Sequence, residues 1–220
     1  MATKPSPSAA NDSDRRDATD LVSDLVTNEM VFGVVGAVGS GTSEIASDLA
    51  ELLGESGFDV HIVKARRLIE NFIKDTDFVI PAVKGVDQIK CLQDAGDEMR
   101  KIRGHSAIAE SFAVEIRSIR AKELGLSPES REPIQPNKEK RAYILDSIRH
   151  PAEILLLRRV YQQSFCVIGV VCDELTRQNR LMDKYDSGKS AINDLMKRDE
   201  KASEKNGQQV ASAFHLSDFL

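Results

Sequence analysis

A short apolar run followed by a glycine-rich turn and a helical pattern restricts the fold of this chain more than any other feature. Residues 30–53 read MVFGVVGAVGSGTSEIASDLAELL. Gly36 and Gly41 have the spacing of a phosphate-binding loop, G-x-x-x-x-G-K-[ST], and Ser43 stands at its last position, but Thr42 replaces the lysine. Because a strand, a loop and a helix occur in the order that such loops require, the sequence predicts a nucleotide-binding P-loop.

The predicted loop binds phosphate mainly through its main chain. Glycines allow successive N–H groups to point at one anion, and the following helix contributes its positive end. The hydroxyl of Ser43 is expected to coordinate Mg²⁺, whereas Thr42 supplies no cation for the phosphates. The alternative is a tight turn without a ligand. The predicted nucleotide-binding residues of the loop are Gly36, Ala37, Val38, Gly39, Ser40, Gly41, Thr42 and Ser43.

A second segment, RAYILDSIRHPAE at residues 141–153, indicates the other half of such a site. An apolar strand is expected to end at Asp146, where a carboxylate can hold Mg²⁺ together with Ser43. Arg149 follows at the carboxyl edge of the sheet, where ligands bind in open α/β folds. The alternatives are a turn or helix-capping role for Asp146 and a surface ion pair for Arg149. His150 is expected to be structural.

Arginines on two predicted helices are further candidates. Arg177 and Arg180 are three residues apart and Arg198 follows, as in the mobile lids with which nucleotide kinases cover phosphates. We therefore predict that Arg177 and Arg180 contact nucleotide, with a solvated charged helix as the alternative. Arg100 and Arg103 stand where kinases of this architecture hold a second nucleotide, although an ordinary amphipathic helix explains them equally well.

Strands alternate with helices along the chain, and the strands are continuously apolar, which is typical of a sheet covered on both faces. We expect a P-loop NTPase-like, three-layer α/β/α fold with a mainly parallel sheet and helical insertions. The expected strands are residues 31–35, 58–63, 142–145 and 165–171. The expected helices are residues 43–56, 65–74, 86–103, 106–124, 151–161 and 174–185, followed by a charged segment, 186–206, for which no helix is predicted.

The domain organisation follows from the same patterns. Residues 1–28 are expected to be a disordered tail with a short helix. Residues 29–205 would form the P-loop domain, and residues 206–220 would begin a linker. The net charge of −5 and the pI of about 5.5 give no reason to expect a nucleic-acid-binding stripe.

Cellular location is predicted from cysteine use and from the absence of targeting signals. The cysteines form no C-x-x-C pair, so buried free thiols and a reduced, cytoplasmic protein are expected. The first 20 residues lack the apolar core of a secretory signal, and no apolar run is long enough for a membrane span. A homo-oligomer is a further expectation.

Several stretches together resemble the amino-terminal half of the anti-phage dCTP deaminase, or deoxycytidylate deaminase-related, family. They are VFGVVGAVGSGTSEIASDLAELL, AGDEMRK, RAYILDSIRHPAEILLLRRVYQQSFCVIGVVC and GQQVASAFHLSDFL, and the resemblance begins near residue 29 and is poor across residues 123–140. It implies a kinase-like P-loop domain in front of a zinc-dependent deaminase domain that depletes deoxycytidine nucleotides. An antitoxin RNA partner is implied for part of the family.

The resemblance also implies that the loop commonly lacks its lysine, and that Gly36, Gly41, Ser43, Asp146 and Arg149 face nucleotide. The H-x-E and P-C-x-x-C motifs, which hold and use zinc in such deaminases, do not occur in this chain, and neither does the nucleophile motif G-x-S-x-G. Zinc and deaminase catalysis are therefore assigned to no residue here.

Three functional hypotheses remain open at the level of the sequence. The first is a regulatory module that binds a nucleoside triphosphate with Mg²⁺ for a deaminase domain in cis. The second is a small nucleotide or nucleoside kinase in which an arginine replaces the loop lysine. The third is an interaction module for RNA or protein that uses its loop only structurally.

Overall fold

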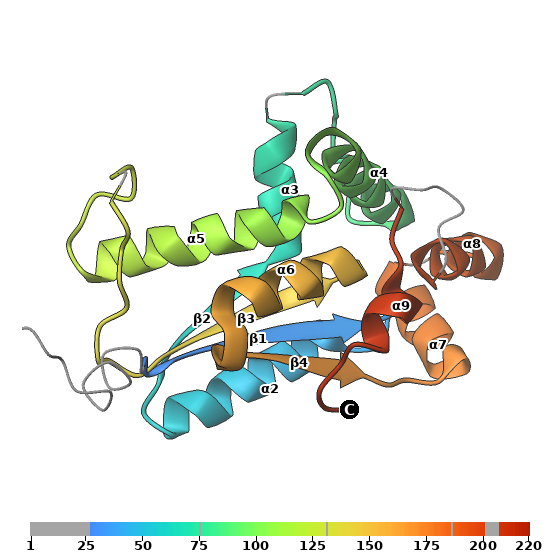
Figure 1. Ribbon diagram of the computed structural model, residues 1–220. Coiled ribbons are helices and arrows are strands. Elements are labelled where there is room, and N and C mark those ends of the chain that lie inside the picture. The colour runs from blue at the N-terminus through green and yellow to red at the C-terminus, as the bar shows by residue number, and fades with distance from the viewer. Residues whose placement is uncertain (1–26, 75, 131, 186, 201–206) are drawn as a thin grey trace, which may run out of the picture.

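The computed structural model describes residues 27–74, 76–130, 132–185, 187–200 and 207–220. Within them, a parallel four-stranded sheet has the order β2-β3-β1-β4 (Figure 1). Its strands are β1 (Glu29–Gly36), β2 (Asp59–Lys64), β3 (Arg141–Ile148) and β4 (Phe165–Val170). Because every pair in this sheet is parallel, the carboxyl ends of all its strands meet at one edge.

Helices cover both faces of the sheet and extend beyond its carboxyl edge. Helix α2 lies on one face, whereas α3, α5 and α6 lie on the other (Figure 1). The expected three-layer α/β/α class is thereby confirmed. The helices are α2 (Thr42–Glu55), α3 (Ala65–Ile73), α4 (Val86–Arg103), α5 (Ala107–Glu123), α6 (Pro151–Tyr161), α7 (Glu174–Tyr185), α8 (Lys189–Glu200) and α9 (Val210–Phe214).

The side chains of strand β1 show why helices must pack on both faces of the sheet. Val31 and Val35 pack into the larger apolar cluster with α3, α5 and α6, whereas Phe32 and Val34 pack into the cluster on the α2 side. All four side chains are at most 9% exposed. Alternate side chains of a strand point to opposite faces, so a continuously apolar strand stabilises the fold only between two helical layers.

Two expectations about the chain's elements are corrected. The third strand does not end at Asp146 but continues to Ile148, so Asp146 lies inside β3. The charged segment after α7 contains a helix, α8, because Ile192, Leu195 and Met196 form a buried stripe on it. The predicted tail and short helix, apart from residues 27 and 28, lie outside the described residues.

The segment predicted to begin a linker packs onto the sheet. Helix α9 contacts β1 and α6, and Asp218 lies beside the free edge of β4. Its carboxylate accepts a hydrogen bond from the Val167 N–H at 2.8 Å and forms a 2.6 Å ion pair with Arg158. The Gly169 N–H donates to the Phe219 carbonyl at 2.8 Å, so residues 218 and 219 pair with part of the edge strand.

The cysteine expectation is partly wrong. Cys91, Cys166 and Cys172 are free, as expected, but each is half-buried rather than buried. Burial still raises the pKa of the Cys91 and Cys166 thiols, which disfavours the reactive thiolate. Among the described residues, no helix combines the length and apolar character needed to cross a membrane.

Candidate nucleotide site

The glycine-rich loop joins the end of β1 to the start of α2. Gly39 and Gly41 adopt positive φ angles of 83° and 98°, a region that glycine enters without steric cost. Gly41 is the N-cap of α2, and the Ser40 N–H closes a turn onto the Ala37 carbonyl at 3.0 Å. The helix N-terminus therefore opens at the carboxyl edge of the sheet, as in an anion-binding loop.

A cavity of about 520 Å³, here called the loop cavity, lies in front of this turn. It contains both acidic and basic side chains, with the basic ones contributed by β2, α3, α7 and the end of β3. Its lining comprises Val38, Gly39, Gly41, Thr42, Ser43, Glu44, Lys64, Ala65, Arg66, Ile89, Leu92, Asp146, Ser147, Arg149, Arg180, Leu181, Lys184 and Tyr185.

The two predicted magnesium ligands lie side by side in the loop cavity. The Ser43 hydroxyl donates a hydrogen bond to Asp146 Oδ2 at 2.7 Å, and Asp146 is only 2% exposed. Ser147 donates to the other carboxylate oxygen at 3.0 Å from a strained backbone position with φ of 75°. This pair offers the oxygen donors that Mg²⁺ prefers, at the start of α2.

Arg149 reaches the loop through an acidic side chain that the sequence did not assign to the site. Its guanidinium lies 2.5 Å from Asp199 Oδ1, and Asp199 Oδ2 accepts the Val38 N–H of the loop at 2.6 Å. Asp199 is 1% exposed and belongs to α8. One carboxylate thus binds both a loop amide and the predicted Arg149.

The arginines of α7 have different environments. Arg180 is exposed at the mouth of the loop cavity, and its guanidinium donates to the Ser40 carbonyl at 3.4 Å. Arg177 is buried and does not line this cavity. Its carbonyl lies close to Gly39, because a side chain added at Gly39 would bring its Cβ atom within 3.0 Å of that oxygen. Helix α7 therefore covers the loop, and of its two predicted arginines only Arg180 lines the cavity.

Three basic residues that line the loop cavity were not predicted from the sequence, namely Lys64, Arg66 and Lys184. Lys64 ends β2 and is paired in register with Asp146 of β3. A signal for Lys64 was present, because it follows an apolar strand and the ends of parallel strands meet at one edge. Of the predicted loop residues, Gly36, Ala37 and Ser40 do not line the cavity.

Arg100 supports the site from behind rather than facing it. It is 1% exposed, forms a 2.8 Å ion pair with Glu153 and lies 3.2 Å from Asp97. The second oxygen of Glu153 accepts the N–H groups of Arg149 and His150 at 2.9 and 3.2 Å. The buried pair therefore fixes the backbone that carries Arg149.

The other two arginines considered from the sequence do not contact the loop. Arg103 lies over the ring of Phe72, 5.1 Å from its centroid. Arg198 bonds Asp94 at 2.6 Å and Asp97 at 3.1 Å, which ties α8 to α4. Burial raises the pKa of Asp97 despite these two arginine neighbours, Arg100 and Arg198.

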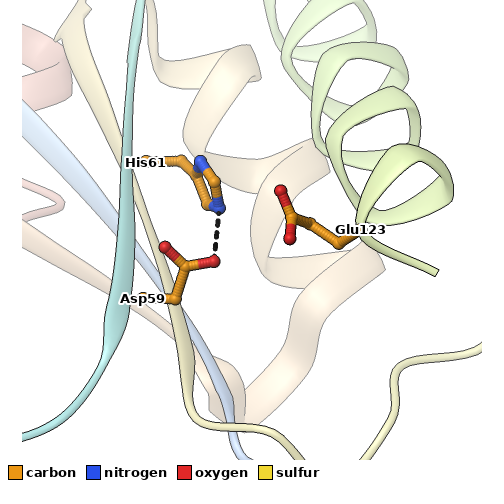
Figure 2. Close-up of side chains that lie close together, drawn as sticks. All are labelled: Asp59, His61 and Glu123. Carbon is orange, nitrogen blue, oxygen red and sulfur yellow. Dashed lines mark hydrogen bonds and ion pairs between the residues drawn. The ribbon is translucent and has the colours of Figure 1, made fainter. Parts of the chain in front are cut away.

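A possible metal-binding group lies at the opposite edge of the sheet. Asp59 and His61 of β2 face Glu123 at the end of α5, and their ligand atoms lie within 4.8 Å of one another (Figure 2). His61 Nε2 bonds Asp59 at 3.1 Å, and Arg141 already places a cation 3.8 Å from the same carboxylate. We assign no metal to this exposed cluster, which is remote from the loop cavity.

The chain matches no protein-family model and no curated protein. Among solved structures it is similar to a gluconokinase from Sinorhizobium meliloti 1021, with 15% identity over 86% of this chain and 90% of that chain and a TM-score of 0.39. It is also similar to a putative fructose transport system kinase from Silicibacter sp. TM1040, with 14% identity over 87% of each chain and a TM-score of 0.42. A shikimate kinase from Acinetobacter baumannii in complex with shikimate shares 13% identity over 86% of this chain and 81% of that chain, with a TM-score of 0.38. These similarities transfer no substrate to this chain.

Proposed function

We propose that the loop cavity binds a nucleoside triphosphate with Mg²⁺ and that the chain is a small nucleotide or nucleoside kinase. The observation that carries this proposal is the contact between Ser43 and Asp146 at the start of α2. P-loop enzymes hold the metal beside the β- and γ-phosphates with a loop hydroxyl and a strand carboxylate, so this contact supports the proposal.

The residues around this pair fit a phosphate ligand. The loop residues Val38, Gly39 and Gly41 line the same cavity as this pair. A Cβ atom at Gly41 would lie 3.2 Å from the Arg180 guanidinium, which shows how closely that cation approaches the loop backbone. When bound, Mg²⁺ would neutralise phosphate charge, and Ser43 and Asp146 would hold it.

The missing lysine is the main chemical objection, because phosphoryl transfer needs cations on the transferred group. Thr42 is buried and cannot supply one. We propose that Arg180 from α7 and Lys64 from β2 provide this charge, with Arg149 joining them after release from Asp199. Guanidinium groups match phosphate oxygens in pairs, which makes arginine a suitable substitute.

Calorimetric titration with Mg–ATP and Mg–dNTPs tests the binding step. Ser43→Ala and Asp146→Asn should each weaken Mg²⁺-dependent binding about tenfold or more, equivalent to about 1.4 kcal/mol per decade. Ser47→Ala, an exposed position on the same helix, is the matched control and should bind as the wild type does. Wild-type protein that binds no nucleotide at millimolar concentration would refute the proposal.

Phosphoryl transfer is tested separately with ATP and a panel of nucleosides and nucleoside monophosphates. Production of ADP together with a phosphorylated acceptor supports a kinase, and Arg180→Gln should reduce its rate. Arg159→Gln, an exposed position on α6, serves as the control. Nucleotide binding without turnover of any acceptor would instead favour the second candidate.

That candidate is a regulatory nucleotide-binding module of a dCTP deaminase-type defence protein. It is favoured by the loop itself, since Thr42 leaves the binding amides without the ammonium group that phosphoryl transfer uses. The module would pass its nucleotide state to a deaminase domain in cis, with an antitoxin RNA as a further partner. Changed deaminase activity in a longer chain carrying Ser43→Ala would support it, and unchanged activity would contradict it.

A further inference from the structure

A smaller cavity of about 130 Å³, here called the inner pocket, adjoins the loop cavity on the α4 side. The two share lining residues, including Val38, Arg149 and Ser147, so the inner pocket continues inward from the phosphate-binding loop. A cavity of only about 10–15 Å³ is enough to hold one water molecule. The inner pocket is about ten times larger, so it has room for a small ring. Its apolar lining residues are Val38, Ala65, Ile69, Ile89, Leu92 and Ile108, and four charged residues, Arg66, Arg100, Arg149 and Asp199, line it as well.

Two residues with buried amide side chains also line the inner pocket. Gln93 of α4 is 4% exposed, and Gln208, which precedes α9, is 8% exposed. The Oε1 atom of each has no hydrogen-bond partner among the described residues. Buried polar atoms are normally satisfied, so two unpaired acceptors on residues that line one cavity point to a ligand that donates hydrogen bonds.

The backbone holds both glutamines in place beside Arg149. The Gln209 N–H donates to the Arg149 carbonyl at 2.9 Å, which anchors the segment carrying Gln208. Gln93 lies on α4, next to Asp94. The ion pair between Asp94 and Arg198 connects α4 to α8. Gln93 therefore lies in a helix, and Gln208 lies in the buried segment that leads into α9.

We propose that the inner pocket binds the amino-bearing base of the acceptor, a nucleoside monophosphate whose phosphate faces Arg149, while Mg–ATP is held by the phosphate loop. This inference rests on the proposed function, because it places the phosphate in the loop cavity. A flat ring fills the apolar walls, and its exocyclic amino group donates to the carbonyl oxygens of Gln93 and Gln208. Cytosine, adenine and guanine carry such a group, whereas thymine offers a single ring N–H.

Calorimetric titration of the wild-type protein with dCMP, dAMP, dGMP and dTMP tests the base preference without any substitution. At least one amino-bearing monophosphate should bind about tenfold more tightly than dTMP, the discrimination expected when a site's buried polar groups would otherwise stay unpaired. Equal affinity for all four would overturn the inference, while Mg–ATP binding to the loop would remain intact.

Substitution of Gln93 and Gln208 tests whether these two side chains cause the preference for amino-bearing bases over thymine. Gln93→Leu and Gln208→Leu should each remove most of the preference over dTMP and leave Mg–ATP affinity unchanged. Gln88→Leu is the matched control, because Gln88 is also buried on α4 but lies outside both cavities and bonds the Pro81 carbonyl. A preference that survives both substitutions overturns the inference. Wild-type protein that binds neither Mg–ATP nor a monophosphate refutes the proposed function and the inference together.

Discussion

Asp199 accepts a hydrogen bond from the main-chain N–H of Val38 at 2.6 Å, so a side chain of the protein itself engages an amide of the phosphate loop. The same carboxylate pairs with Arg149. An anion of the chain thus lies against two of the groups predicted to bind nucleotide, and a bound phosphate would compete with it for both.

Replacing Asp199 with asparagine should strengthen binding of Mg–ATP, by about three- to tenfold, because it removes a buried negative charge beside the phosphate site. It should also lower the thermal unfolding temperature, since Arg149 loses its partner. Calorimetric titration and thermal unfolding measure the two effects. Asp194→Asn, an exposed site on the same helix, should change neither, and weaker binding by folded Asp199→Asn protein would contradict the competition.

Gly39→Ala should destabilise the protein by about 1–3 kcal/mol, because it forces a non-glycine residue into a left-handed backbone conformation. The new methyl group would also lie 3.0 Å from the Arg177 carbonyl and from Leu181. Denaturant unfolding measures the change. Gly54→Ala is the control, since Gly54 lies in α2 with open space around it, and alanine there should stabilise by about 0.5–1 kcal/mol. Equal effects at both positions would argue against a strained loop.

Glu153→Ala should lower the free energy of unfolding by about 3–5 kcal/mol, because it leaves the buried Arg100 guanidinium without its main partner. It should also weaken nucleotide binding, since Glu153 holds the backbone N–H of Arg149. Glu98→Ala breaks the exposed ion pair with Lys101 on α4 and should cost only about 0–1 kcal/mol. A cost at Glu153 no larger than the cost at Glu98 would show that the buried pair does not stabilise the fold.

Unfolding free energy should fall as the pH drops from about 6.5 to about 4, because of His150. Burial lowers the pKa of His150 from its ordinary value of 6.5 to about 4, with Glu153 opposing this shift and Arg100 and His105 adding to it. The folded protein therefore binds fewer protons than the unfolded chain in this window, and stability is complete only above it. Protonation would also block Nδ1, which accepts the Ala152 N–H at 3.1 Å.

Denaturant unfolding of wild type and His150→Asn at several pH values measures this contribution. Asparagine is a good helix N-cap, so the variant should fold and should lose part of the decline between pH 6.5 and 4. Identical pH profiles for the two proteins would show that another group causes the decline.

The sequence predicted the helices best where their ends carry clear signals. Helices α4, α6 and α7 have the expected boundaries. Helix α6 begins with Pro151 after a His150 cap, and α4 ends just before Gly104. Local residue chemistry therefore determines the start of α6 and the end of α4. The P-loop was predictable for the same reason, since its glycines are needed at particular backbone angles.

Helix α8 was missed because its sequence is charged and follows Ser187 and Gly188. Its buried stripe of Ile192, Leu195 and Met196 has helical spacing and could have revealed it. The approach of Asp199 to Val38 had no such signal. Contacts between residues 161 positions apart depend on how distant elements pack, and no local pattern encodes them.

The strand order has a consequence for how this chain reaches its native state. Strand β1 lies between β3 and β4, and Glu29 at its start bonds Arg141, which lies 112 residues further along the chain. Neither pairing of β1 can form until the intervening segments have been brought together, at the entropic cost of closing long loops. We therefore expect refolding to be slow compared with that of a helical bundle of similar size, with helical structure appearing before the sheet.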